Sequence, residues 1–406
     1  MKKLRCCSQC PANYFCEPYI DKYGRLLCPA LRGIDVGHCP FFDCPSYTEC
    51  HGIKLQYFEE LGGFACHDFF SRFVTEAVRR RNDYARLEEE YPSLKSIKKG
   101  KRFPIKAGSF YPSDPRMLEE EIKKSFLSNK GPCCLPINTK KKKRELFALI
   151  SPCAGYLYAG GVYAHLYKSL AEDGIPKAII ILGYSTRGIS PYKVSIMSKG
   201  AWITPFGKVE IDSMLAEKIK EKCPFVKEDP IAHAFESQIE IQLPYIQYID
   251  ILQFPKELAE IGPPYFCHTF SFVPIIIASN EAEVYEELGE AITKICKNKH
   301  IIIIAIAQFT MYEKADIARA IDNFLIEPIL EVDVEKLMER VREKSEKHSM
   351  GGFGPAATML MAAKLSGIKG GKLLKYQTSG DITGDYSSVV GYAGIEFKKG
   401  KHLVQP

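Results

Sequence analysis

The chain has 406 residues, of which 46% are apolar and 26% are charged, and its formal net charge is +6. This length is typical of about two to three domains, and so mild a charge does not by itself indicate a nucleic-acid binder. No uninterrupted apolar run approaches the length of a membrane span, and the polar start lacks the apolar segment of a signal peptide. We therefore expect a cytoplasmic protein without a membrane partner.

The cysteines are concentrated at the start of the chain, which holds nine of the fifteen. They are Cys6, Cys7, Cys10, Cys16, Cys28, Cys39, Cys44, Cys50 and Cys66. In a reducing compartment such clustering indicates metal ligation before disulfides, and Cys7 and Cys10 form a CxxC that presents two thiolates from one turn. We predict that residues 1–67 form a small, loop-rich metal-binding domain holding zinc or an iron–sulfur cluster. Free thiols or disulfides are the alternative.

Residues 68–102 are predicted to form a helix and a basic linker. Apolar residues recur at helical spacing from 68 to 90, Pro92 ends the helix, and lysines and Arg102 follow. The charges are typical of a solvated helix face and a flexible linker. The alternative is a phosphate-binding strip that acts with the cysteine-rich segment on nucleic acid.

From residue 103 to 406 strand and helix patterns alternate. Helical patterns occur at 116–127, 162–171, 212–221, 282–297, 313–324, 333–347 and 355–366. Short apolar runs of strand length lie at 147–150, 178–182, 273–278 and 301–307. Apolar strands separated by helices predict an α/β sheet covered on both faces, and the proline-rich 246–272 is interpreted as an inserted excursion.

Several motifs occur in this region in a fixed order. They are Ala107-Gly-Ser-Phe-Tyr-Pro112, Ser151-Pro-Cys-Ala-Gly-Tyr156, Thr204-Pro-Phe-Gly-Lys-Val-Glu-Ile-Asp212, Glu236-Ser-Gln-Ile-Glu-Ile-Gln-Leu-Pro244, Ser379-Gly-Asp-Ile-Thr-Gly-Asp385 and Val389-Val-Gly-Tyr-Ala393. Together they resemble the motifs of the Memo family, protein B of the AmmeMemoRadiSam system. The resemblance implies the fold of the class III extradiol dioxygenases, which use iron held by two histidines and a carboxylate.

The resemblance also implies a metal site of three histidines and a cysteine, and this chain departs from it at each position. The corresponding residues here are Cys153, Thr186 and Met311 for the histidines and Gly351 for the cysteine. Gln308 stands for the motif's aspartate. Because an open metal site needs about three ligands, dioxygenase chemistry is not expected. Cys153 and Met311 are soft donors that suit Cu(I), or they are ordinary packing residues.

Three functions follow from this pattern. We expect first a non-catalytic scaffold domain that binds another protein. The second is a thiol-dependent or redox enzyme that uses Cys153 near Glu236 and Gln308, with His233 as the nearby histidine. The third is nucleic-acid binding through the cysteine-rich module and the basic linker.

Overall fold

The computed structural model describes residues 96–97, 99–137, 144–186, 190–253, 268–297, 300–343 and 350–400. Before them it gives only the backbone of four short strands, namely β1 (Tyr19–Ile20), β2 (Leu26–Leu27), β3 (Leu55–Phe58) and β4 (Gly63–Cys66). The side chains of all nine N-terminal cysteines and the helix expected at 68–90 lie outside the described residues. The predicted metal-binding domain therefore stays a prediction.

A mixed sheet of nine strands forms the centre of the described part of the chain. Its order is β11, β8, β12, β7, β13, β6, β16, β14, with β15 also paired to β16. The four central strands, β12, β7, β13 and β6, run parallel. The bounds are β6 (Leu146–Ser151), β7 (Ala178–Tyr184), β8 (Val194–Ile196), β11 (Val226–Glu228), β12 (Ser271–Ile277), β13 (Ile301–Ile306), β14 (Met311–Glu313), β15 (Gly371–Thr378) and β16 (Val389–Lys398).

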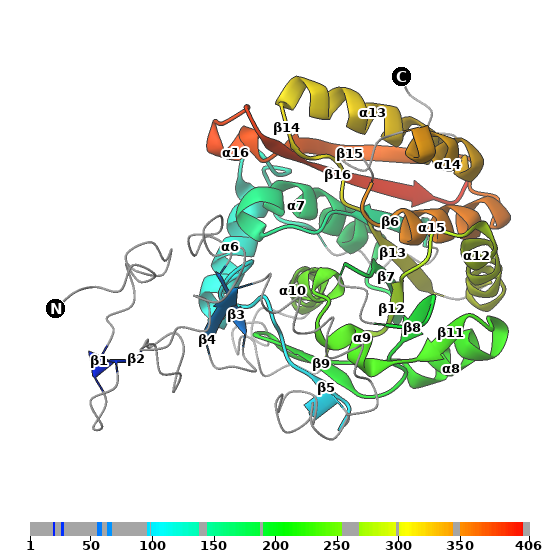
Figure 1. The fold of residues 1–406 in the computed structure, drawn as a ribbon, viewed down its shortest axis with the longest axis horizontal. Coiled ribbons are helices and arrows are strands. Elements are labelled where there is room, and N and C mark those ends of the chain that lie inside the picture. The colour runs from blue at the N-terminus through cyan, green and yellow to red at the C-terminus, as the bar shows by residue number, and fades with distance from the viewer. Residues whose placement is uncertain are drawn as a thin grey trace.

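Helices cover both faces of this sheet (Figure 1). One face packs on α6 (Pro115–Leu127), α7 (Tyr156–Asp173) and α10 (Gln238–Ile251). The other packs on α8 (Ser213–Lys222), α12 (Ala282–Cys296), α13 (Ala315–Glu331), α14 (Val334–Glu343) and α15 (Phe353–Leu365). The short helices α9 (Pro230–Ala234) and α16 (Gly380–Thr383) lie in connections. The expected α/β sheet with helices on both faces is confirmed.

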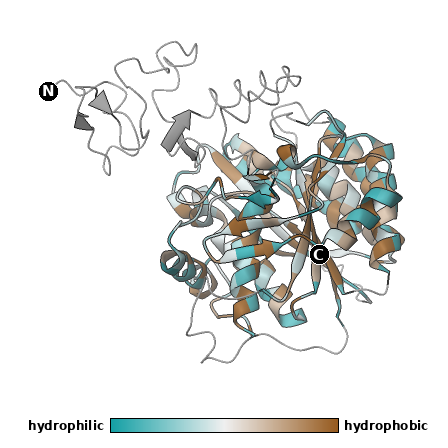
Figure 2. Cartoon of the chain, turned by 90° about the horizontal axis from the view of Figure 1, so that it is seen from below, coloured by the Kyte–Doolittle hydropathy of each residue, from teal (hydrophilic) through white to brown (hydrophobic). Residues whose placement is uncertain are grey.

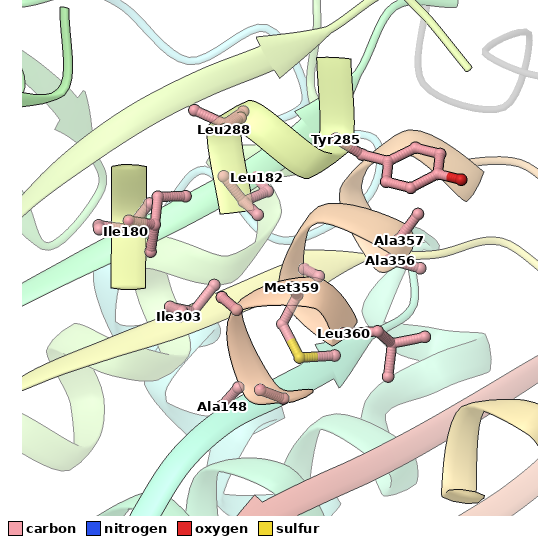
Figure 3. Close-up of a cluster of buried hydrophobic side chains, with 14 of the residues drawn as sticks. Ala148, Ile180, Leu182, Tyr285, Leu288, Ile303, Ala356, Ala357, Met359 and Leu360 are labelled. Atoms are coloured by element: carbon pink, nitrogen blue, oxygen red, sulfur yellow. The ribbon is translucent and has the colours of Figure 1, made fainter. Parts of the chain in front are cut away.

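The core lies in two layers, one on each side of the sheet. Along β7, Ile180 and Leu182 face one cluster while Ile179 and Ile181 face the other, because successive side chains of a strand point to opposite faces. Figure 3 shows part of the first cluster, in which side chains of α12 and α15 meet those of β6, β7 and β13. The four central parallel strands are mostly apolar, whereas the outer helices carry their polar faces outward (Figure 2). Burial on both faces explains the isoleucine-rich runs.

The four predicted strands and seven predicted helices all form, with boundaries shifted by a few residues at most ends. The prediction for 246–272 is wrong at its start, because 246–251 belongs to α10. Every residue of α10 is buried, so its sequence lacks the polar face that gives a helical period. Residues 254–267 of that stretch lie outside the described part of the chain.

A second, three-stranded sheet contains the end of the predicted linker. Its order is β10 (Gly207–Glu210), β9 (Ala201–Thr204) and β5 (Lys101–Arg102). Arg102 is 1% exposed, with its guanidinium 4.2 Å from the centre of the Trp202 ring. Assigning Arg102 to a solvated linker was therefore wrong. A run of basic residues in the sequence does not reveal which of them will be buried against a distant partner. The division of the chain into domains at 102 and 103 stays a prediction.

Candidate functional site

The loops after three neighbouring parallel strands assemble the candidate site. Cys153 follows β6, Thr186 follows β7 and Gln308 follows β13. The sheet order β7, β13, β6 places the carboxyl ends of these strands at one edge, where α/β proteins build their sites. Gly351, immediately before α15, joins them through a bridge to Gln308. The fold therefore gathers residues that are separated by up to about 200 positions in the sequence.

Gly351 and Gln308 hold each other by paired backbone hydrogen bonds. The Gln308 N–H donates to the Gly351 carbonyl at 2.8 Å, and the Gly351 N–H donates back at 2.9 Å. A Cβ atom at 351 would lie 3.3 Å from the Tyr184 hydroxyl and 3.2 Å from Gln308 Cβ. The Tyr184 ring and the Gln308 side chain therefore occupy the space into which a side chain at 351 would project.

Thr186 is committed to Glu236, which is 2% exposed. Its backbone N–H and its hydroxyl each donate to the Glu236 carboxylate at 2.7 Å, and Gln238 Nε2 donates to it at 2.8 Å. Neutral donors thus hold a buried carboxylate in place. Glu236, one of the three weak catalytic candidates, fixes the loop after β7.

Cys153 lies among buried polar groups at the start of α7. Burial raises the pKa of its thiol to about 12, with Lys106 opposing the rise and the carboxylates of Glu236 and Glu240 adding to it. Lys106 is 5% exposed, with Nζ 4.4 Å from the centre of the Phe110 ring. At neutral pH the Cys153 thiol is therefore protonated.

His233 lies elsewhere in the core. It is fully buried, and its ring packs edge-on against Trp202 with 5.9 Å between ring centres. Burial lowers its pKa to about 3, and the Arg102 cation adds to this effect, so the ring is neutral. His233 is therefore a neutral packing residue against Trp202, and the nearby positive charge is that of Arg102.

Met311 occupies an exposed edge beside the site. It begins β14, pairs with Val390 of β16 and is 46% exposed. The next residue, Tyr312, is 77% exposed and has a φ of 62°, a conformation that is rare for an aromatic residue. Burial raises the pKa of the Tyr392 hydroxyl, and Tyr158, Tyr312 and Cys153 add to this rise to a lesser degree.

Sequence reasoning missed Tyr184, Lys106 and the tyrosines around Cys153. Tyr184 had a usable signal, because it lies only two residues before Thr186. Lys106 carried none, since a lysine before the Ala107 motif resembles any surface lysine. No group of three or more histidine, cysteine or acidic side chains is placed to hold a metal ion in the described ranges.

A doubly covered α/β sheet with its polar cluster at the carboxyl ends of β6, β7 and β13 defines a Memo-like domain as the class of protein. The chain belongs to the Memo family, since the family model described as Memo-like protein matches residues 102–396.

Relatives of known sequence support this assignment. A MEMO1 family protein of Methanopyrus kandleri is 40% identical over 301 residues, covering 74% of this chain and 99% of its own length. A MEMO1 family protein of Methanocaldococcus jannaschii is 38% identical, covering 72% of this chain and 97% of its own length.

An uncharacterised Escherichia coli K12 protein of solved structure aligns with a TM-score of 0.41 at 12% identity, covering 62% of this chain and 99% of its own. None of the helices in the described ranges is long and apolar enough to cross a membrane.

Alkylation of Cys153 should be slow and strongly pH-dependent. Relative to a thiol of pKa 9, a pKa of about 12 lowers the thiolate fraction at neutral pH about 10³-fold. Labelling by iodoacetamide should therefore rise about tenfold per pH unit from pH 7 to 10, read by peptide mass spectrometry. The exposed Cys133 and Cys134 serve as fast internal controls. Labelling of Cys153 at the controls' rate near pH 7 would contradict a buried thiol.

Proposed function

We propose that the Memo-like domain is a non-catalytic scaffold that binds another protein, joined to a cysteine-rich N-terminal segment that holds zinc or an iron–sulfur cluster. The observation that carries the proposal is the state of Thr186 and Gly351. The Thr186 hydroxyl is committed to Glu236, and the Tyr184 ring lies beside a glycine that has no side chain. The family's metal centre is therefore lost at two positions where neither residue offers a free donor.

The remaining family positions support the same conclusion. Iron and zinc sites of the open kind use about three imidazole or carboxylate ligands. Cys153 and Met311 supply two sulfur donors, the first partly buried in the loop after β6 and the second on an exposed edge strand. These residues do not fit the family's metal, and Cu(I) is the one ion whose preferences they match.

The two alternatives have weaker support. A thiol enzyme needs a lowered pKa or an adjacent base, whereas burial raises the pKa of Cys153 to about 12 and His233 packs on Trp202. A nucleic-acid strip would use the basic residues of the linker, but Arg102 is buried in an ion pair with Glu240. Of the other basic linker residues only Lys99 and Lys101 have described side chains; both are exposed, and two lysines are few for a strip that follows a phosphate backbone.

Exposed apolar side chains around the site favour a protein partner. Leu157 is 66% exposed, Tyr158 37%, Met311 46% and Tyr312 77%. Tyrosine and methionine are enriched where proteins bind one another, and the four residues form two neighbouring pairs, one at the start of α7 and one in β14. Tyr312 keeps a left-handed backbone conformation, which is strained for a tyrosine, and the surrounding structure holds it there with its side chain exposed.

Site-specific crosslinking tests this proposal. A photoreactive benzoylphenylalanine at position 312 should yield one discrete crosslinked protein in extracts of the source cells, identified by mass spectrometry. Met214 of α8 has the same 77% exposure and is the matched control, which should yield none. The crosslink should also weaken at least tenfold in Tyr158→Ala. Equal capture from 214, no capture from 312, or turnover of a small molecule that depends on Cys153 would overturn the proposal.

A further inference from the structure

Two adjacent thiols lie in the loop between α6 and β6, on a different segment from the strand-end loops. Cys133 and Cys134 are both exposed, whereas Cys223 and Cys296 are buried and Cys153 is intermediate. Consecutive Cα atoms are about 3.8 Å apart, which brings both sulfur atoms within reach of a single ligand. An exposed pair of this kind is a two-sulfur donor set, and neither thiol belongs to the apolar core of the described residues.

The loop that carries these thiols is packed tightly onto two helices. A Cβ atom at Gly131 would lie 2.0 Å from the Ser125 carbonyl oxygen of α6, and one at Gly161 of α7 would lie 2.6 Å from the Lys130 carbonyl oxygen. The Gly131 N–H donates to the Ser128 hydroxyl at 3.0 Å. Backbone approach this close requires glycine on both sides and fixes the position of the loop.

The backbone of Cys133 is also held in an unusual conformation. Its φ is 58°, in the left-handed region that an L-residue other than glycine rarely adopts. Its thiol contacts the Ser128 carbonyl oxygen at 3.4 Å and the Gly131 carbonyl oxygen at 3.8 Å. The first contact is exposed and the second is partly buried, and both are weak because a thiol is a poor hydrogen-bond donor.

Neighbouring residues are badly placed to form a disulfide with each other. Disulfides usually join Cα atoms about 4.4–6.8 Å apart, and the bond holds the two sulfurs at about 2.0 Å. Consecutive residues are closer than this range, so an internal disulfide is strained and easily reduced. A cation held between the two sulfur atoms does not require a sulfur–sulfur bond, so the strain of a disulfide between neighbouring residues does not arise. The geometry thus favours chelation over oxidation.

We propose that Cys133 and Cys134 form a binding site for a soft, thiophilic cation held by two thiolates. Soft ions accept sulfur donors, and two such donors suffice for ions that prefer low coordination numbers. Each thiol gives up its proton when the ion binds, and no electron is transferred. Structural zinc takes four protein ligands and does not fit this pair, since no third histidine, cysteine or acidic side chain is placed for it in the described residues.

Phenylarsine oxide is the probe that tests the site in the full chain. Its arsenic, which stays trivalent, bonds to both sulfurs while its oxygen leaves as water with the two thiol protons. With the probe in excess over all thiols, maleimide labelling of Cys133 and Cys134 should slow at least tenfold, read residue by residue by peptide mass spectrometry. Excess 2-mercaptoethanol should leave the protection in place, and 2,3-dimercaptopropanol should remove it.

Single substitutions decide whether the two thiols act together. In Cys133→Ser, protection of Cys134 should disappear, and Cys133→Gly, which suits the left-handed backbone, should give the same result. Unlabelled Cys223 and Cys296 report that each variant is folded, because both are buried. Cys134 protected equally without its neighbour, or neither thiol protected in the unsubstituted protein, would overturn the proposal.

Discussion

Replacing Glu240 with alanine should lower the free energy of unfolding by about 3–5 kcal/mol, the cost of leaving a buried charge without its partner. The Glu240 carboxylate, which is fully buried, accepts hydrogen bonds from Arg102 Nη1 at 2.7 Å and the Tyr111 hydroxyl at 2.6 Å. It also accepts from the backbone N–H groups of Ile105 and Lys106. Chemical denaturation followed by fluorescence measures the loss, since Trp202 is the one tryptophan of the chain and lies under Arg102.

A surface pair provides the matched control. Glu290 and Lys294 are joined at 2.9 Å on α12, but both side chains are more than half exposed. Glu290→Ala should therefore leave stability nearly unchanged, because exposed ion pairs contribute little. The double variant Arg102→Met with Glu240→Leu should lose less unfolding free energy than the sum of the losses in the single variants Arg102→Met and Glu240→Leu. The difference measures the interaction between the two side chains. A loss from Glu240→Ala no larger than that from Glu290→Ala would show that Arg102 is solvated after all.

Under the proposed loss of the metal centre, restoring the family's ligand types should create a new metal site. The changes are Cys153→His, Thr186→His, Met311→His and Gly351→Cys, and Tyr184→Ala must accompany them. The fifth change is needed because a Cβ at 351 already lies 3.3 Å from the Tyr184 hydroxyl. With four suitable donors the chain should bind one further equivalent of zinc or iron(II) at micromolar concentration, at least about 10³-fold more tightly than the natural chain.

The N-terminal cysteines require that this gain be measured as a difference. The natural chain and the five-residue variant are both saturated with zinc first and are then titrated with iron(II). After gel filtration, the total metal retained by each protein is counted, and the two totals are compared. The four-residue variant that keeps Tyr184 is the control and should gain less metal, because the tyrosine ring crowds the new thiol. A further equivalent bound by the natural chain that disappears in Cys153→Ser would contradict the loss of the metal centre.

Much of the fold was predictable because the strands are buried on both faces. Runs such as 301–307 are too short for a buried helix and too apolar for a surface loop, so their assignment as strands needed no tertiary information. The strands of the second sheet were missed because they are short and β10 alternates exposed with buried residues. Helix α10 was missed for the opposite reason, since it is buried on every side.

The candidate site was predictable in its residue types and only partly in its contacts. Cys153, Thr186, Gln308 and Gly351 follow from aligned motifs, and the structure brings all four to one edge of the sheet. Their partners did not follow. The interaction of Thr186 with Glu236 joins residues 50 positions apart, and no local pattern reports which distant carboxylate a threonine will meet.

What the sequence alone determined is the chemistry that is present: an α/β domain of the Memo family with a thiol at Cys153, a hydroxyl at Thr186, a thioether at Met311 and no side chain at Gly351. Only the tertiary structure decided how each group is used. It buried Arg102 against Glu240, 138 residues away, raised the pKa of the Cys153 thiol and placed Tyr184 beside Gly351. The reason is physical, because side-chain chemistry is carried by each residue by itself, whereas burial and pairing depend on which distant segments the fold brings together.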